Sequence, residues 1–244
     1  MPPDGSGRPG RSRSPVDREP KLVHITKCAG NALENWGLER GYKWGRHWKA
    51  VKEAWSRGLV APHEGCMKSE PWHLPPCLFR ESPYAGRELF AVVRDPYERA
   101  ISEFRCPWKG FRAPTGTSEE KKAQRATATT EQLNEWLQRK LQHGAARPPF
   151  RNGHFIPQHL YLFDACGGRL IPERNILRME RLQDDFADLV RRYRLRPGPL
   201  RRSNESLMPR FAARDLTPET RRLVEEAYAR DFELLGYRRL GQGA

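Results

Sequence analysis

The chain has 244 residues, with 44 Lys and Arg against 30 Asp and Glu, which leaves a net charge of +14. This length is sufficient for one large domain with a buried core. Its longest apolar run, Leu89–Val93, is far too short for a transmembrane helix. The strongly basic composition instead favours anionic partners: nucleic acid, sulfated or phosphorylated substrates, or an anionic nucleotide.

The first twenty residues differ in composition from the rest of the chain. Residues 1–20 are rich in Gly, Pro, Ser and Arg, so we expect a disordered arm there and no signal peptide. Residues 21–244 are expected to form a single domain. The five cysteines are odd in number and irregularly spaced, which argues against a complete disulfide framework. A reducing compartment is favoured and the cytoplasm is expected; the Golgi lumen is the alternative if the chain is part of a longer enzyme.

Apolar patterns and caps predict strands that alternate with helices. The expected strands are Lys21–Ile25, Glu88–Val93 and Ile176–Met179, and the expected helices are Asn31–Arg40, Trp44–Gly58, a helix from Asp95 with the buried stripe Tyr97, Ala100, Ile101 and Phe104, Thr130–Leu141, Leu182–Tyr193 and Thr217–Leu235. Residues 107–130 are expected to be an irregular surface excursion. This alternation predicts an α/β fold in which a central, mostly parallel sheet is flanked by helices.

The sequence contains clear signals for the start of the helix that follows the second strand. Asp95 is the expected N-cap and Pro96 suits the first turn. Glu98 is expected to complete a capping box. The strand before it is apolar throughout, as is typical of a parallel strand that is buried on both faces.

Two strand ends carry residues that are able to bind an anion. The first is Thr26–Ala32, where backbone N–H groups at a helix start and the ammonium of Lys27 form a possible phosphate cradle. The segment lacks the G-x-x-x-x-G-K-[ST] pattern, and an ordinary turn is the alternative. The second is Arg94, which ends a buried strand and is able to grip an anion bidentately, with Ser102 two helical turns further on. A structural Arg–carboxylate pair is the alternative there. Together the two sites indicate a ligand with two separate phosphate groups.

Both segments resemble motifs of one enzyme family. His24–Leu33 resembles the 5′-phosphosulfate loop of sulfotransferases that use 3′-phosphoadenosine 5′-phosphosulfate (PAPS), and Val93–Phe104 resembles their 3′-phosphate motif. The similarity is closest to the Golgi-type carbohydrate branch and to soluble algal-like relatives. Further similar segments are His154–Gln158, Leu177–Leu182, Ser203–Ser206 and Tyr228–Phe232. The resemblance thus covers about residues 21–240.

The resemblance implies a P-loop-like sulfotransferase fold and transfer of a sulfuryl group from PAPS, with adenosine 3′,5′-bisphosphate (PAP) as product. It places Lys27 on the 5′-phosphate and the bridging oxygen, and Arg94 and Ser102 on the 3′-phosphate. The backbone amides around the 5′-phosphate would come from Cys28, Ala29, Gly30, Asn31 and Ala32. Relatives commonly carry Thr or Ser where this chain has Asn31 and Ala32. The amide of Asn31 is still able to donate to a phosphate, whereas a contact that needs a hydroxyl is in doubt.

The acceptor must lose a proton to a general base as it attacks sulfur. The candidates are His63, Glu64, His73, His154 and His159. His73 is favoured because it lies between the two nucleotide motifs, in the rigid segment Pro71–Pro76, and because histidine titrates near neutral pH. The alternative is a histidine that is hydrogen-bonded within a proline-rich loop.

Other functions explain the sequence less well. His63, Cys66, His73 and Cys77 could form a zinc site, but their spacing matches no standard framework, and no metal is predicted. Between residues 191 and 202 the chain is rich in arginine, either as a solvated face or as an aid to anion binding. A P-loop-type kinase and a basic nucleic-acid-binding module remain alternatives, the latter without any recognised binding motif. The favoured acceptor is a carbohydrate or small-molecule hydroxyl, and its identity and the oligomeric state stay open.

Overall fold

A small parallel sheet organises the fold. The computed structural model describes residues 19–59, 70–112, 117–147, 153–163, 168–201 and 208–241. Within these ranges the strands are β1 (Lys21–Leu22), β2 (Leu89–Val93) and β3 (Ile176–Arg178), in the order β1-β2-β3 with both pairings parallel. The predicted α/β class with a parallel sheet is confirmed, while most of the expected N-terminal arm lies outside the described residues.

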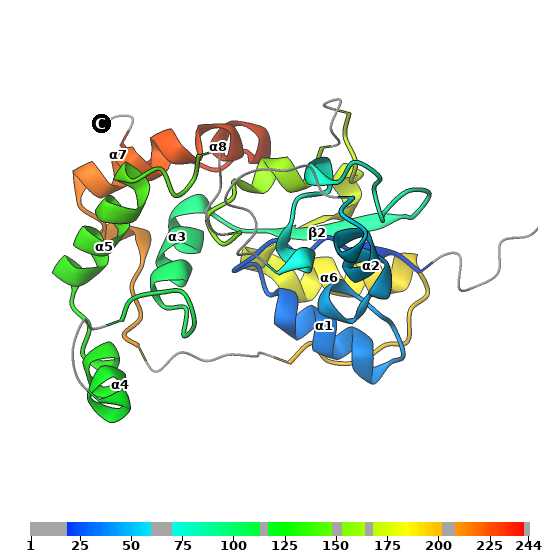
Figure 1. Ribbon diagram of the computed structural model, residues 1–244, viewed down its shortest axis with the longest axis horizontal. Coiled ribbons are helices and arrows are strands. Elements are labelled where there is room, and N and C mark those ends of the chain that lie inside the picture. The colour runs from blue at the N-terminus through cyan, green and yellow to red at the C-terminus, as the bar shows by residue number, and fades with distance from the viewer. Residues whose placement is uncertain are drawn as a thin grey trace, which may run out of the picture.

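Three helices pack around the sheet and form the first hydrophobic core. They are α1 (Gly30–Glu39), α2 (Lys49–Ser56) and α6 (Leu182–Arg192), grouped around β2 in Figure 1. Every residue of β2 is buried, as its apolar sequence predicts. Aromatic side chains join the layers: the ring centroids of Trp44 and Phe90 lie 4.9 Å apart, and those of Trp36 and Phe186 lie 4.8 Å apart.

A second group of helices lies beside the first (Figure 1). Its members are α3 (Pro96–Phe104), α4 (Ser118–Ala126), α5 (Thr130–Gln142), α7 (Pro218–Ala227) and α8 (Ala229–Leu235). A second hydrophobic core, which includes Phe104, Trp136 and Val224, joins α3, α5, α7 and α8. Because α3 starts directly after β2, it connects the two cores. None of the described helices is long and apolar enough to cross a membrane.

The start of α3 is as predicted in all but one respect. Asp95 is the N-cap, and its carboxylate accepts from the backbone N–H of Tyr97 at 2.9 Å and of Glu98 at 3.2 Å. The predicted capping box is wrong, because the Glu98 side chain accepts from Ala213 N instead. Glu180 takes over the missing contact and accepts from Asp95 N at 2.7 Å.

Two other predicted elements are wrong in their extent. Residues 107–130 contain α4, whose Thr117 and Glu120 form a capping box. Since α4 buries none of its residues, it has no apolar periodicity that would reveal it. The long helix predicted over residues 217–235 is two helices, because Tyr228 interrupts it with φ −120° and ψ 27°.

The remaining differences are smaller. β1 ends at Leu22 rather than at Ile25, although Val23 N still donates to Phe90 O at 2.9 Å. The helix predicted from Trp44 begins as a 3₁₀ turn, and α2 starts at Lys49. Gly45 has a positive φ of 49°, and a Cβ there would lie 1.8 Å from Glu34 Oε1, so the chain needs glycine at this turn.

The N-cap of α3 gives a first prediction. Replacement of Asp95 by Ala removes the acceptor of two backbone N–H groups and is expected to cost about 1 kcal/mol of unfolding free energy. This corresponds to a Tm lower by about 2–4 °C for a chain of this size. Asp95→Asn keeps an acceptor oxygen and is expected to stay within about 0.5 kcal/mol of the wild type. Thermal denaturation measures both, and equal losses would contradict the capping role.

Candidate active site

The two segments predicted to bind phosphate groups line one cavity. It has a volume of about 1360 Å³ and lies at the carboxyl ends of β1 and β2, between the two groups of helices. Of the predicted binding residues, the cavity wall includes Lys27, Ala29, Gly30, Asn31, Ala32, Arg94 and Ser102. Cys28 is buried behind this wall, where its Sγ donates to Gln158 Oε1 at 3.5 Å. The two segments that the sequence singled out therefore line the same cavity, and their roles in binding stay predictions.

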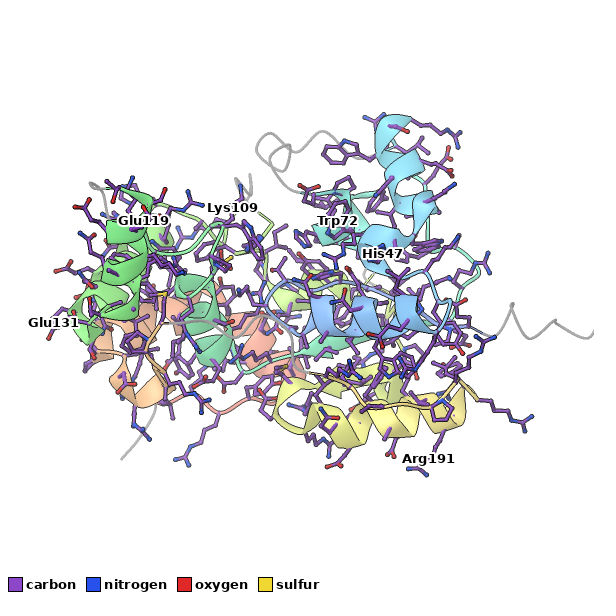
Figure 2. The ribbon with its side chains drawn as sticks, turned by 90° about the horizontal axis from the view of Figure 1, so that it is seen from below. His47, Trp72, Lys109, Glu119, Glu131 and Arg191 are labelled. Atoms are coloured by element: carbon purple, nitrogen blue, oxygen red, sulfur yellow. The ribbon has the colours of Figure 1, made fainter. Side chains whose placement is uncertain are left out.

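The cavity is strongly positive. Its described lining contains ten lysine and arginine residues against a single carboxylate, that of Glu70. The cations are Lys27, Arg46, Arg94, Arg105, Lys109, Arg112, Lys122, Arg125, Arg201 and Arg210. Figure 2 shows Lys109 and Trp72 coming from the two opposite groups of elements. Such an arrangement focuses a positive potential on the cavity and attracts a polyanion.

The segment Thr26–Ala32, which we call the lysine loop, has an unusual backbone. Lys27 and Ala29 have positive φ values of 66° and 60°, which are uncommon for residues other than glycine. The N-cap of α1 is Ala29, which offers no side-chain acceptor to the N–H groups of the first turn. The next residue must be glycine, since a Cβ on Gly30 would lie 2.1 Å from His24 Nε2. Strained backbone and an uncapped helix start on a cationic cavity are typical of an anion site.

Arg94 is fixed through its backbone. Gln158 accepts from Arg94 N at 2.9 Å and donates to Arg94 O at 2.8 Å. The guanidinium donates to Lys27 O at 3.5 Å and lies 3.6 Å from Glu98 Oε2. The alternative of a structural Arg–carboxylate pair thus applies in part, through Glu98. Because both contacts of the Arg94 guanidinium are long, several of its N–H donors are available to a ligand.

Arg99 connects the loops that form the cavity wall, a role that was not predicted from the sequence. It is 3% exposed. Its Nε donates to Thr26 O at 3.1 Å, and its Nη2 lies 3.2 Å from Thr26 Oγ1, 3.2 Å from His154 O and 2.9 Å from Ile156 O. A charged residue beside the apolar stripe of α3 was the available signal.

Gln158 is held in turn by the C-terminal helices. Its backbone N–H and that of His159 each donate to the buried carboxylate of Asp231 at 2.8 Å. The imidazole Nδ1 of His159 also lies 2.7 Å from Asp231. His159, one of the five candidate bases, thus has a partner on α8 and is not part of the described cavity lining.

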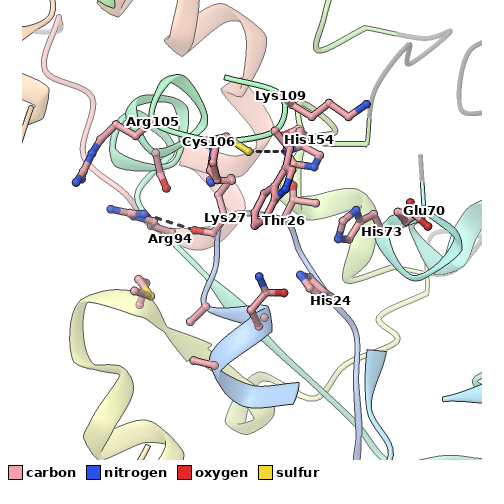
Figure 3. A pocket seen from close by; sticks show the side chains of 18 of the residues that line it. His24, Thr26, Lys27, Glu70, His73, Arg94, Arg105, Cys106, Lys109 and His154 are labelled. Atoms are coloured by element: carbon pink, nitrogen blue, oxygen red, sulfur yellow. Dashed lines mark hydrogen bonds between the residues drawn. The ribbon is translucent and has the colours of Figure 1, made fainter. Parts of the chain in front are cut away.

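Three histidines form a row on the cavity wall (Figure 3). The His73 ring lies edge-on between those of His24 and His154, with centroid distances of 4.7 Å and 5.4 Å. His24 Nδ1 lies 2.5 Å from the buried carboxylate of Glu34. Burial lowers the pKa of His73 well below its usual range, and the positive charges of His24, His154 and Lys27 lower it further. His73 is therefore a neutral imidazole at neutral pH.

His154 has the opposite electrostatic character. Its Nδ1 lies 2.8 Å from Glu103 Oε2 and 4.0 Å from Cys106 Sγ. Burial alone would lower the pKa of His154, but the hydrogen bonds with Cys106 and Glu103 raise it to about 9. The site thus contains one neutral and one protonated imidazole side by side.

The remaining candidate bases and zinc ligands are only partly described by the structure. His63, Glu64 and Cys66 lie outside the described residues, and Cys77 Sγ donates to Leu160 O at 3.3 Å without lining the cavity. Among described residues, the group whose atoms are close enough for a metal is Glu103, Cys106 and His154, within 4.8 Å of one another. A hydrogen-bonded ion pair accounts for its 2.8 Å contact.

The basic run between residues 191 and 202 is mostly structural where it is described. Arg191 pairs with Asp188, Arg192 donates to Arg174 O, and Arg196 donates to Arg40 O. Arg201 lines the cavity, and Arg202 lies outside the described residues. Among the described arginines of this run, Arg201 is the one that lines the cavity, so the alternative of an aid to anion binding applies to Arg201.

Comparison with known proteins identifies the family. Residues 84–238 match the family model described as "Sulfotransferase family". The match spans more than half of the chain, and the chain therefore belongs to this family. Neither the curated proteins nor the solved structures that were compared gave a match. Arg94, Ser102 and His154 lie within the matched region, whereas Lys27 and His73 precede it.

The buried guanidinium gives the second prediction. Arg99→Met leaves four buried acceptor atoms without their donor and is expected to cost at least about 3 kcal/mol of unfolding free energy. Urea denaturation measures this loss. Arg222→Met is the matched control, because Arg222 is exposed and pairs with Glu226 on the surface, and it should cost no more than about 0.5 kcal/mol. Similar losses for the two variants would contradict the proposed importance of Arg99.

Proposed function

Because the chain belongs to the sulfotransferase family, we propose that it transfers the sulfuryl group of PAPS to a hydroxyl of a carbohydrate or small-molecule acceptor and releases PAP. The observation that carries this proposal is that the lysine loop and the segment Val93–Phe104, which contains Arg94 and Ser102, line the same cationic cavity. Its volume of about 1360 Å³ exceeds that of a usual small-ligand site, which leaves room for a donor and an acceptor together.

The proposed roles of the nucleotide-binding residues follow from their positions. Lys27 and the backbone N–H groups of Cys28–Ala32 hold the 5′-phosphate and the bridging oxygen. Arg94, directly after β2, and Ser102 on α3 both line the cavity and hold the 3′-phosphate. Two separate cationic positions select a nucleotide that carries phosphate at both ends of its ribose.

In the proposed reaction, the acceptor hydroxyl attacks sulfur as the bond from sulfur to the bridging oxygen breaks. The hydroxyl proton passes to His73, which is available as a base because its low pKa keeps it neutral. Lys27 stabilises the charge that develops on the leaving phosphate oxygen. His154, which is protonated, cannot accept the proton until it loses its own. These pKa directions support His73 over His154 as the base.

Nucleotide binding gives the third prediction. PAP at one hundred times its Kd is expected to stabilise the protein by about 2.7 kcal/mol, whereas ADP, which lacks the 3′-phosphate, should stabilise it much less at the same concentration. Arg94→Ala should weaken PAP binding by about 10- to 150-fold through loss of a charge-assisted contact. Calorimetry with PAP and ADP measures both effects. The control is Arg191→Ala, a surface arginine paired with Asp188. Equal stabilisation by PAP and ADP would refute the proposed donor.

The fourth prediction concerns the base. His73→Ala and His73→Gln are both expected to lower turnover of labelled PAPS by about 10²- to 10⁴-fold, since neither side chain accepts a proton. PAP affinity should remain close to that of the wild type. The base acts in its neutral form, so activity falls as pH decreases through the pKa of His73. Because that pKa is lowered, the fall should occur below the ordinary histidine range, and activity should be flat on this limb near pH 7.

The control for this experiment is His143→Gln. His143 is exposed and bonds to the Arg139 carbonyl within its own helix end, so its replacement should leave turnover unchanged. If His73→Ala retains most of the activity while His154→Ala loses it, the base is His154 and the Pro71–Pro76 segment only forms the cavity wall.

A further inference from the structure

The cavity contains a second reactive group that the proposed sulfuryl transfer does not use. Cys106 follows the C-terminal end of α3, one turn beyond Glu103, and lines the cavity beside Lys27 and His154 (Figure 3). Its Sγ lies 4.0 Å from His154 Nδ1, which lies 2.8 Å from Glu103 Oε2. The thiol and the carboxylate both face the same nitrogen, Nδ1, so Glu103 holds a proton on His154 and the resulting imidazolium faces Cys106. A cationic imidazole beside a thiol favours the thiolate, which is the nucleophilic form.

The Glu103 carboxylate contacts His154 through Oε2. It is 1% exposed, and its second oxygen, Oε1, has no hydrogen-bond partner among the described residues. A buried carboxylate without another cation in contact favours the protonated form of the imidazole that it touches. That imidazolium in turn favours the thiolate form of Cys106.

A second buried cysteine near the cavity provides a contrast. Cys28 donates to the amide oxygen of Gln158 at 3.5 Å and does not belong to the described cavity lining. Burial raises the pKa of Cys28 to about 11. The two thiols are both nearly inaccessible from the outer surface, but only Cys106 of the two faces a cavity and an imidazole.

We propose that Cys106, with His154 and Glu103, is a thiolate nucleophile on the wall of the cavity, and that small electrophiles of the hydroperoxide class modify it. The thiolate attacks the O–H oxygen of the peroxide, the O–O bond breaks, and the other oxygen leaves as hydroxide or alkoxide, which the buffered solvent protonates to water or an alcohol. Sulfur is oxidised to a sulfenic acid while the peroxide is reduced. No further reductant or oxidant is needed.

The charged groups around Cys106 support this assignment. Burial by itself would raise the pKa of Cys106, but the hydrogen bond to His154, the charge of Lys27 and a backbone hydrogen bond from Lys109 lower it to about 7. Glu103 acts in the opposite direction, and the Arg125 guanidinium, which also lines the cavity, adds positive charge. The positive groups therefore outweigh both burial and the carboxylate.

Modification should also obstruct the cavity. A sulfenic oxygen, or a larger adduct, would extend from the wall beside Lys27 into the space proposed for the donor. Oxidation is therefore expected to weaken PAP binding, a consequence that rests on the proposed function. Formation of the adduct itself does not rest on it.

The test measures thiolate reactivity in the native, full-length protein without nucleotide. Iodoacetamide alkylates a thiolate with loss of iodide, and peptide mass spectrometry gives the rate at each cysteine. At pH 6.5, Cys106 is expected to react about 10²-fold faster than Cys28, because its larger thiolate fraction outweighs the lower intrinsic nucleophilicity of a low-pKa thiolate. Equal rates at the two cysteines, or a faster rate at Cys28, would overturn the proposal.

Two matched histidine variants separate the role of His154 from a general effect of mutation. His154→Gln removes the imidazolium and should slow alkylation of Cys106 by about tenfold at pH 6.5. His159→Gln removes an imidazole that also contacts a buried carboxylate, that of Asp231, and should leave the rate unchanged. An unchanged rate in His154→Gln would overturn the proposed role of His154.

The hydroperoxide step has its own readout. Wild-type protein treated with hydrogen peroxide and dimedone is expected to carry the dimedone adduct of a sulfenic acid on the Cys106 peptide, while Cys106→Ser protein lacks that adduct. Absence of the adduct from the wild type would overturn the hydroperoxide assignment. If the adduct forms but PAP binding is absent in both the oxidised and the unoxidised protein, the proposed function fails while the thiolate site stands.

Discussion

One buried guanidinium holds the site together. Arg99 belongs to α3, but its donors go to Thr26 in the lysine loop and to the carbonyl groups of His154 and Ile156. A buried charge is expensive unless it is fully hydrogen-bonded, and here backbone oxygens rather than a contacting carboxylate provide the partners. Since these oxygens lie on loops from distant parts of the sequence, the need to satisfy Arg99 also fixes where Lys27 and His154 stand.

Gln158 and Asp231 extend this constraint to the C-terminal helices. The Gln158 side chain accepts from the backbone N–H of Arg94 and donates to its carbonyl oxygen, and Asp231 accepts from the backbone N–H of Gln158. Asp231 belongs to α8, which begins after the break at Tyr228. The Tyr228 ring is buried and lies 5.8 Å from the Arg99 guanidinium. The break that divides the predicted long helix sets α8 apart from α7. The Asp231 carboxylate on α8 holds the backbone of Gln158, and the Gln158 side chain contacts both Arg94 and Cys28.

The sequence predicted those parts of the site that depend on local signals. The apolar run of β2, the Asp95 cap and the adjacent parallel strands suffice to place Arg94 and the lysine loop at one edge of the sheet. The Glu103–His154–Cys106 group was not predicted, because His154 is 51 residues from Glu103 and no periodic pattern joins them. Helix α4 was not predicted because it buries none of its residues and therefore has no apolar stripe. Its capping box was the available local signal.

The distribution of carboxylates decides how the three neighbouring histidines divide their chemistry. His24 contacts Glu34 and His154 contacts Glu103, whereas His73 has no carboxylate partner in the described part of the chain. A buried imidazole without an anionic partner, such as that of His73, loses its proton more easily than one that contacts a carboxylate, as His154 does. The same arrangement leaves His73 neutral, as the proposed base must be, and keeps His154 protonated, which favours the proposed thiolate of Cys106. The proposed base and the proposed thiolate thus depend on one electrostatic arrangement, in which Glu103 contacts His154 and no carboxylate contacts His73 among the described residues.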